Sequence, residues 1–312
     1  MLLQAASIVR YFDREGLGRI IFVWNDSVET PAGFRDQLGD ALNGLDHEFK
    51  QAPEVGIEQE TLGVYGWVTQ QAVKLLVSQR VRSSNYLVLD AKNHFVRSTS
   101  VNDFIARDGK GIFRTEELSG EAAMRYRYSQ GYFGLNPAEV PCRAVRPHTP
   151  FLLNKKIVAS MLDRIVQLEG VSVGKAFLLR EEKLTEFLGY QAFYLSEGGQ
   201  LSDLYVELHA PARPILWGTL WREPDYFENW MNLAKSIDTK IVGVHWAACI
   251  NMNDRQKQSL SEFWKDRNLI DTLEEGRKLI DSVALGLPEG ELEHARSLVS
   301  VPRGRVPPSA AK

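Results

Sequence analysis

The residues best placed to carry chemistry follow one short apolar run. Tyr86 to Leu89 are all apolar, which predicts a buried strand. Asp90, Lys92 and Asn93 come directly after this strand. In open α/β sheets, ligands bind at the carboxyl ends of the strands. A carboxylate in this position predicts a site for a metal ion or a phosphate-bearing substrate. The alternative is that Asp90 only caps the turn after the strand.

Further polar candidates lie on two predicted helices. Gln70 and Lys74 are four residues apart in a helix predicted for residues 66–79, so they share a face. This face either reaches a ligand or is exposed to solvent. Glu186 lies among aromatic residues, Tyr190 included, in a helix predicted for residues 181–193. A carboxylate in such surroundings can act as a base, and aromatic faces suit sugar rings. The alternative is an amphipathic helix whose glutamate faces solvent.

One histidine stands at the end of another predicted strand. His245 follows a strand predicted for residues 240–244. Three roles fit this position: a metal ligand, a phosphate contact, or a hydrogen-bonded core histidine. The segment His148–Phe151 precedes a predicted helix and is placed where it could contact an acceptor substrate.

The elements that must position these residues alternate in type. Apolar residues at helical spacing predict helices over residues 2–13, 66–79, 116–133, 155–167, 181–193, 225–234, 254–267 and 272–284, and a shorter one within 33–42. Strands are predicted for residues 19–24, 86–89 and 240–244. This order predicts an α/β fold with parallel strand pairing and C-terminal helices. We expect a single domain over residues 1–300 and a disordered tail over residues 301–312.

Composition narrows the class of protein. The chain has 312 residues, 44% of them hydrophobic, which is ample for a core. A formal net charge of -3 gives no reason to expect a nucleic-acid partner. No apolar run is long enough for a membrane span. Two cysteines far apart, Cys142 and Cys249, predict buried free thiols in a reducing compartment, and hence a cytoplasmic protein.

Several of these segments together resemble a known family. The segments are Tyr65-Gly-Trp-Val-Thr-Gln-Gln-Ala-Val-Lys-Leu75, Tyr86-Leu-Val-Leu-Asp-Ala-Lys-Asn-His-Phe95, Thr185-Glu-Phe-Leu-Gly-Tyr190 and Gly243-Val-His245. They look like a bacterial family of uncharacterised proteins described as glycosyltransferases of the GT-A type. The resemblance spans most of residues 1–270. It implies a GT-A-like, Rossmann-like and mostly parallel sheet flanked by helices. It also implies a nucleotide-sugar donor and a glycan or small-molecule acceptor, with Asp90 in the place of the Asp-x-Asp metal motif.

The second acidic position of that motif is occupied by a lysine. Two carboxylates would hold a divalent cation, Mn²⁺ or Mg²⁺, which neutralises the leaving diphosphate. Protonated Lys92 cannot ligate a metal but can bind phosphate as a point charge. The site is then either poor in metal, with Lys92 replacing part of the cation's role, or built on Asp90 and His245 as metal ligands with Asn93 beside them. A solvated Lys92 without a role is the third alternative.

The resemblance assigns expected roles. Asp90 would bind the metal or organise the diphosphate, and Glu186 would orient or activate the acceptor hydroxyl. The residues expected to bind substrate are Gln70, Lys74, Lys92, Asn93 and Tyr190. His245 would close the site.

Two further observations favour other functions. The chain begins in a predicted helix, where a GT-A-like sheet opens with a strand, so we expect a strand encoded upstream of Met1. The missing strand and Lys92 both favour a non-catalytic protein that binds a glycan or a partner and keeps the fold. A different phosphate-handling transferase also fits the cluster at residues 90–93, although the glycine-lysine phosphate loop is absent.

Overall fold

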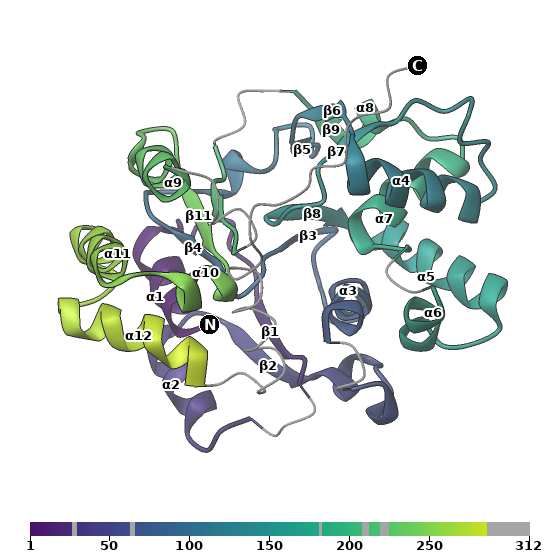
Figure 1. Ribbon diagram of the computed structural model, residues 1–312. Helices are drawn as coiled ribbons and strands as arrows, with labels where there is room; N and C mark the ends of the chain where they lie inside the picture. Colours follow the sequence, from purple (N-terminus) through teal and green to yellow (C-terminus); the bar gives the residue numbers. More distant parts are fainter. Residues whose placement is uncertain (27–29, 63–65, 181–182, 208–211, 219–224, 286–312) are drawn as a thin grey trace, which may run out of the picture. The chain divides into compact units, whose positions relative to one another are not determined.

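The computed structural model describes residues 1–26, 30–62, 66–180, 183–207, 212–218 and 225–285 (Figure 1). The chain divides into two compact units. Unit 1 comprises Met1–Ala91 and Ser98–Pro211, and unit 2 comprises Lys92–Arg97 and Ala212–Lys312. The chain therefore passes from unit 1 to unit 2 directly after Ala91. Whether the two units form one domain over residues 1–300 stays a prediction.

Unit 1 contains helices and four pairs of short strands. Its helices are α1 (Leu2–Tyr11), α2 (Phe34–Ala41), α3 (Gly66–Leu76), α4 (Gly120–Tyr132), α5 (Lys155–Glu169), α6 (Val173–Leu179), α7 (Glu186–Ser196) and α8 (Leu201–Leu204). Its strands are β1 (Ile20–Trp24), β2 (His47–Gln51), β3 (Asn85–Val88), β5 (Gly111–Ile112), β6 (Thr115–Glu117), β7 (Arg143–Val145), β8 (Phe151–Asn154) and β9 (Tyr205–Val206). Short 3-10 turns cover Ala52–Val55, Gln59–Thr61, Val77–Gln79 and Val101–Asp103.

Unit 2 is built on one small sheet and four helices among its described residues. The strands are β4 (Asn93–Phe95), β10 (Ile215–Leu216) and β11 (Ile241–Val244). The helices are α9 (Tyr226–Lys235), α10 (Trp246–Asn251), α11 (Asp254–Asp266) and α12 (Leu273–Leu285). In the sheet, β10 pairs parallel with β11, and β4 pairs antiparallel with the other edge of β11.

The predicted mixed α/β class with C-terminal helices is confirmed. The described strands do not form the single, mostly parallel sheet that was expected. They lie in five sheets of two or three strands. The pairs β1–β2 and β5–β9 are parallel, whereas β3–β8 and β6–β7 are antiparallel. Strand β3, expected to pair in parallel, lies antiparallel to β8, with Val88 opposite Phe151. Sequence patterns indicate that a strand is buried, but not which strand lies beside it.

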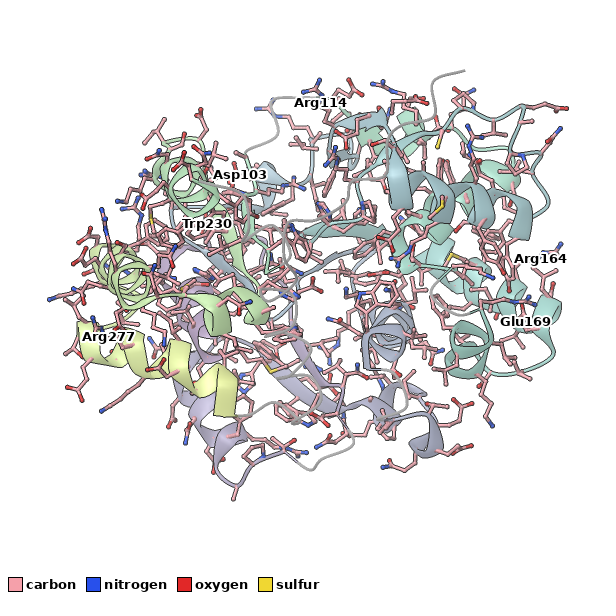
Figure 2. The ribbon with its side chains drawn as sticks, viewed as in Figure 1. Asp103, Arg114, Arg164, Glu169, Trp230 and Arg277 are labelled. Carbon is pink, nitrogen blue, oxygen red and sulfur yellow. The ribbon has the colours of Figure 1, made fainter. Side chains whose placement is uncertain are left out.

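Local signals explain why the helices around the core of unit 1 form where they do. Helix α5 buries Val158, Met161, Leu162 and Ile165, which recur at helical spacing on one face. At its start, Asn154 Oδ1 accepts hydrogen bonds from the backbone amides of the first turn. At its end, Glu169, labelled in Figure 2, receives two hydrogen bonds from the Arg180 guanidinium, 2.8 and 2.6 Å long. This pair fixes α5 to the end of α6.

The boundaries of the predicted helices and strands differ from the structure in several places, and helices α6, α8 and α10 and strands β2 and β4 to β10 were not predicted. The helix predicted to begin at residue 116 begins at Gly120, because Thr115–Glu117 pair with β7 instead. The helix predicted over residues 181–193 begins at Glu186. Asn253 caps α11, since its side chain accepts from the Gln256 amide at 2.9 Å. No strand was predicted at β2, because only one of its five residues is strongly apolar.

Two further expectations concern the C-terminal tail and membrane spans. The predicted disordered tail, residues 301–312, lies outside the residues that the structure describes. Within the described residues, none of the helices combines the length and the apolar character needed to cross a membrane.

Candidate functional site

Asp90 is held at the end of β3 by side chains from three segments of unit 1. Because β8 runs antiparallel to β3, the residues that precede β8 lie beside the carboxyl end of β3. Thr149 Oγ1 donates a hydrogen bond of 2.9 Å to Asp90 Oδ2, and Gln70 Nε2 donates one of 3.3 Å to Oδ1. Gln4, from α1, donates to the Asp90 backbone carbonyl at 2.9 Å. Both carboxylate oxygens and the carbonyl therefore have partners.

Lys74 joins Asp90 to Glu186. Its ammonium lies 2.8 Å from Asp90 Oδ1 and 3.0 Å from Glu186 Oε1. The side chains of Lys74, Asp90 and Glu186 are 13%, 13% and 6% exposed. Burial by itself lowers the pKa of Lys74, but the charges of Glu186 and Asp90 outweigh it and raise the pKa above its ordinary value. Lys74 is therefore a cation, and the three charged groups together carry one net negative charge.

Helix α7 contributes Glu186 to this cluster, and its buried face also carries the aromatic residues Phe187 and Tyr190. The backbone amide of Glu186 donates to Gln71 Oε1 at 3.2 Å, which ties the start of α7 to α3. The Lys74 ammonium also lies 5.3 Å from the centre of the Phe187 ring, within the range of a cation–π interaction. Tyr190, predicted to bind substrate, is buried, and its hydroxyl accepts from the Asn154 amide at 3.2 Å. The contact that the structure gives Tyr190 is thus to the start of α5.

A second group of predicted residues gathers in unit 2, at one edge of the β10–β11–β4 sheet. The strands β10 and β11 both end at this edge, and antiparallel β4 begins there. The His245 amide donates to the Leu216 carbonyl at 2.9 Å, and the Val244 amide donates to the Lys92 carbonyl at 3.0 Å. This pairing places Lys92, His245 and the residue after β10, Trp217, at the same edge.

The side chains at this edge form a row in which one lysine ammonium is followed by the rings of Trp217, His245 and Trp246. The Lys92 ammonium lies 5.1 Å from the centre of the Trp217 ring. The ring centres of Trp217 and His245 are 5.3 Å apart, and those of His245 and Trp246 are also 5.3 Å apart. Lys92, Trp217, His245 and Trp246 are all half-buried. Sequence reasoning missed both tryptophans, although their positions directly beside strand ends were a usable signal.

The backbone of this edge is closely packed. A Cβ atom on Gly218 would lie 2.4 Å from the Ala247 Cβ, so only glycine permits the approach of β10's end to the start of α10. His245 caps α10, because its Nδ1 accepts from the Ala247 amide at 3.3 Å. The proton of a neutral His245 ring is then on Nε2. Asn93 is buried within the sheet, opposite Gly243, rather than displayed at the edge.

The structure gives Asp90 neighbours that do not fit a metal ligand. Its Oδ1 faces an ammonium, and its Oδ2 accepts from a hydroxyl. A cation bound there would have to displace Lys74 from Oδ1. No group of three or more His, Cys, Asp or Glu side chains within the described ranges is arranged to hold a metal ion. Asp90 and His245 belong to different units, so the predicted sharing of an ion between them stays a prediction.

Comparison with known proteins gives a family but no activity. Residues 2–238 match a family of unknown function, DUF6492. No curated protein matches the chain. The matched segment includes every predicted site residue except His245.

Proposed function

The chain belongs to the DUF6492 family of unknown function, and from the chemistry of its residues we propose that it is a glycosyltransferase. It would take a sugar from a nucleotide-sugar donor and pass it to a glycan or small-molecule acceptor. One observation carries this proposal: Lys92, Trp217 and His245 meet where the parallel strands β10 and β11 end. The resemblance of the segments around Asp90 and Glu186 to GT-A-type enzymes adds to it.

The row of side chains suits the two chemical parts of such a donor. An ammonium binds a diphosphate by charge, and the Nε2–H of a neutral imidazole donates a hydrogen bond to phosphate oxygen. Tryptophan rings present flat apolar faces on which a nucleobase or a sugar ring can stack. The carboxyl ends of parallel strands are also where α/β proteins bind such ligands. Lys92 and His245 would therefore contact the diphosphate, and Trp217 or Trp246 a ring.

In this proposal, donor binding does not depend on a divalent cation. Lys92 stands where the resembling family has a second carboxylate, and the carboxylate of Asp90 is occupied by Lys74 and Thr149. Lys92 would supply positive charge to the diphosphate directly. Asp90 would act by holding the end of β3 in place, two residues before Lys92 in the chain. Glu186 would orient the acceptor hydroxyl or accept its proton.

The proposal is tested by a thermal-shift experiment. UDP, GDP and ADP are titrated into the protein, each with EDTA and with Mn²⁺, and the temperature at which the protein unfolds is measured. A nucleotide at 100 times its dissociation constant stabilises the fold by about 2.7 kcal/mol. We expect one nucleotide to stabilise the wild type in EDTA. Lys92→Ala should abolish that shift. Lys240→Ala is a matched control, because Lys240 is a half-buried lysine at the opposite end of the same sheet. If no nucleotide shifts the folded wild type, or both variants behave alike, the proposal is wrong.

One observation favours a second function, a non-catalytic protein that binds glycans. The two carboxylates with expected catalytic roles, Asp90 and Glu186, are both paired with the same lysine. Such an arrangement is also what a purely structural ion cluster looks like. The two functions differ in turnover. A transferase slowly hydrolyses its donor when no acceptor is present, whereas a binding protein releases no nucleoside diphosphate from any nucleotide sugar.

A further inference from the structure

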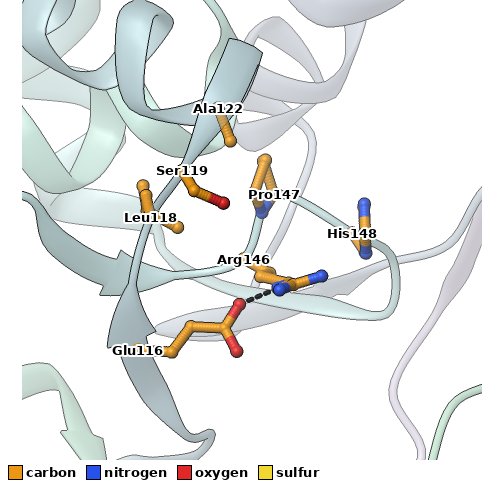
Figure 3. Close-up of a pocket in the computed structure, with 7 residues that line it drawn as sticks. All are labelled: Glu116, Leu118, Ser119, Ala122, Arg146, Pro147 and His148. Carbon is orange, nitrogen blue, oxygen red and sulfur yellow. Dashed lines mark ion pairs between the residues drawn. The ribbon is translucent and has the colours of Figure 1, made fainter. Parts of the chain in front are cut away.

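A cavity of about 120 Å³ lies in unit 1 beside the start of α4 (Figure 3). It is lined by Glu116, Leu118, Ser119, Ala122, Arg146, Pro147 and His148. These residues come from β6, from the start of α4 and from the segment that follows β7. The cavity has room for several water molecules or for one small ligand.

One wall of the cavity is held in place from both sides. Before it, the buried Gln191 amide accepts from the Val145 backbone amide at 2.8 Å and donates to the Val145 carbonyl at 3.0 Å. After it, Thr149 is bonded to Asp90. Arg146, Pro147 and His148 lie between these two anchors. The backbone of this wall is therefore preorganised, which lowers the entropy lost when a ligand binds, while the Arg146 side chain is 62% exposed.

The lining combines hydrogen-bond donors, acceptors and apolar surface without an excess of charge. Arg146 pairs through Nε with Glu116 Oε1, which leaves the other guanidinium nitrogens and the second carboxylate oxygen to meet a ligand. The Ser119 hydroxyl does not cap α4, and Figure 3 shows it turned toward the space above Arg146. Pro147 adds an apolar face, as do two residues around the start of α4. A sugar needs this mixture, because each hydroxyl both donates and accepts while the ring carbons are apolar.

We infer that this cavity of unit 1 binds one uncharged sugar residue. Glu116 accepts hydrogen bonds from sugar hydroxyls, and Arg146 donates to them. The bound sugar packs against Pro147. The balanced charge of the Arg146–Glu116 pair selects a neutral sugar over a phosphorylated or acidic one.

The test is saturation-transfer NMR and titration with methyl β-D-glucopyranoside, methyl β-D-galactopyranoside, methyl α-D-mannopyranoside and, as a charged probe, methyl β-D-glucuronide. The cavity variants are Arg146→Ala and Glu116→Gln. Arg143→Ala is the matched control for arginine, since Arg143 is also exposed and paired with a glutamate but does not line the cavity. Glu117→Gln is the control for glutamate, because neighbouring residues of a strand face opposite sides.

We expect at least one neutral glycoside to bind saturably and tighter than the glucuronide. Each cavity variant should weaken that binding tenfold or more, or 1.4 kcal/mol, and each control by less than twofold. Absence of binding to the folded wild type, preference for the glucuronide, or undiminished binding by both cavity variants would overturn the inference. Nucleotide titration separates the two proposals. Nucleotide binding without glycoside binding contradicts only the sugar site of the cavity, whereas glycoside binding without nucleotide binding contradicts only the transferase.

Discussion

Replacing Lys74 with methionine would leave the carboxylates of Asp90 and Glu186 without the cation that now lies between them. Methionine keeps most of the length and apolar volume of lysine and removes the charge. The cluster would change from one net negative charge to two, in a space where Asp90 and Glu186 are only 13% and 6% exposed. The perturbation is therefore mainly electrostatic.

The expected loss follows from the burial of the pair. Solvent-exposed ion pairs contribute about 0–1 kcal/mol, but removing one partner of a buried pair costs about 3–5 kcal/mol, because the other partner stays buried without compensation. Contacts of 2.8 and 3.0 Å to side chains this little exposed place Lys74 in the buried class. We expect Lys74→Met to lower the free energy of unfolding by about 3–5 kcal/mol. Since domains are typically stable by about 5–15 kcal/mol, the loss is readily measured.

The assay is urea denaturation at pH 7, followed by the fluorescence of the seven tryptophans. Lys50→Met is the matched control, because Lys50 also contacts two carboxylates, Glu48 at 3.1 Å and Glu54 at 3.2 Å. Glu54 is 43% exposed, so water can replace that lysine and the loss should be far smaller. The double variant Lys74→Met/Glu186→Gln removes one orphaned charge and should recover part of the loss. Equal losses for Lys74→Met and Lys50→Met, or no recovery in the double variant, would refute this account of the cluster.

Three other predictions follow from the same geometry. Burial lowers the pKa of His94 from its ordinary value of 6.5 to about 4. Between these two values the unfolded chain binds a proton that the folded chain does not, so the free energy of unfolding decreases as the pH is lowered. Urea denaturation should show that this residue lowers the free energy of unfolding by about 2 kcal/mol between pH 7 and pH 5. The variant His94→Gln keeps an acceptor for Trp264 Nε1 and should lack that part of the decrease. Gln191→Met should lower the free energy of unfolding by about 2–3 kcal/mol, because it leaves the backbone amide and carbonyl of Val145 unpaired. A loss below about 1 kcal/mol would mean that water replaces the side chain. Lys92→Asp should weaken nucleotide binding in EDTA, measured by calorimetric titration, because a carboxylate would replace the ammonium that faces the diphosphate; Mn²⁺ should recover part of the binding, since a carboxylate can hold the cation. A variant that binds as tightly as the wild type in EDTA would contradict it.

Features that depend on neighbours along the chain were predictable from the sequence. Helix α5 and its cap at Asn154 follow from apolar spacing and from one side chain that bonds the first turn. The end of β3 just before Asp90 follows from the change from apolar to charged residues. The place of His245 after β11 follows in the same way. In these cases the determining interactions span only a few residues.

Features that depend on distant segments were decided by the tertiary structure. The sequence by itself determined that Asp90, Lys92 and His245 follow the ends of strands. It could not determine that Lys74 pairs with a residue 112 positions away, or that Asp90 and Lys92 belong to different units. An apolar run is equally compatible with a parallel and an antiparallel partner, so the pairing of β3 with β8, which brings Thr149 to Asp90, had no local signal. Burial supplies the physical reason: a charged side chain in a partly dry site must find an opposite charge, and which one it finds depends on how the whole unit packs.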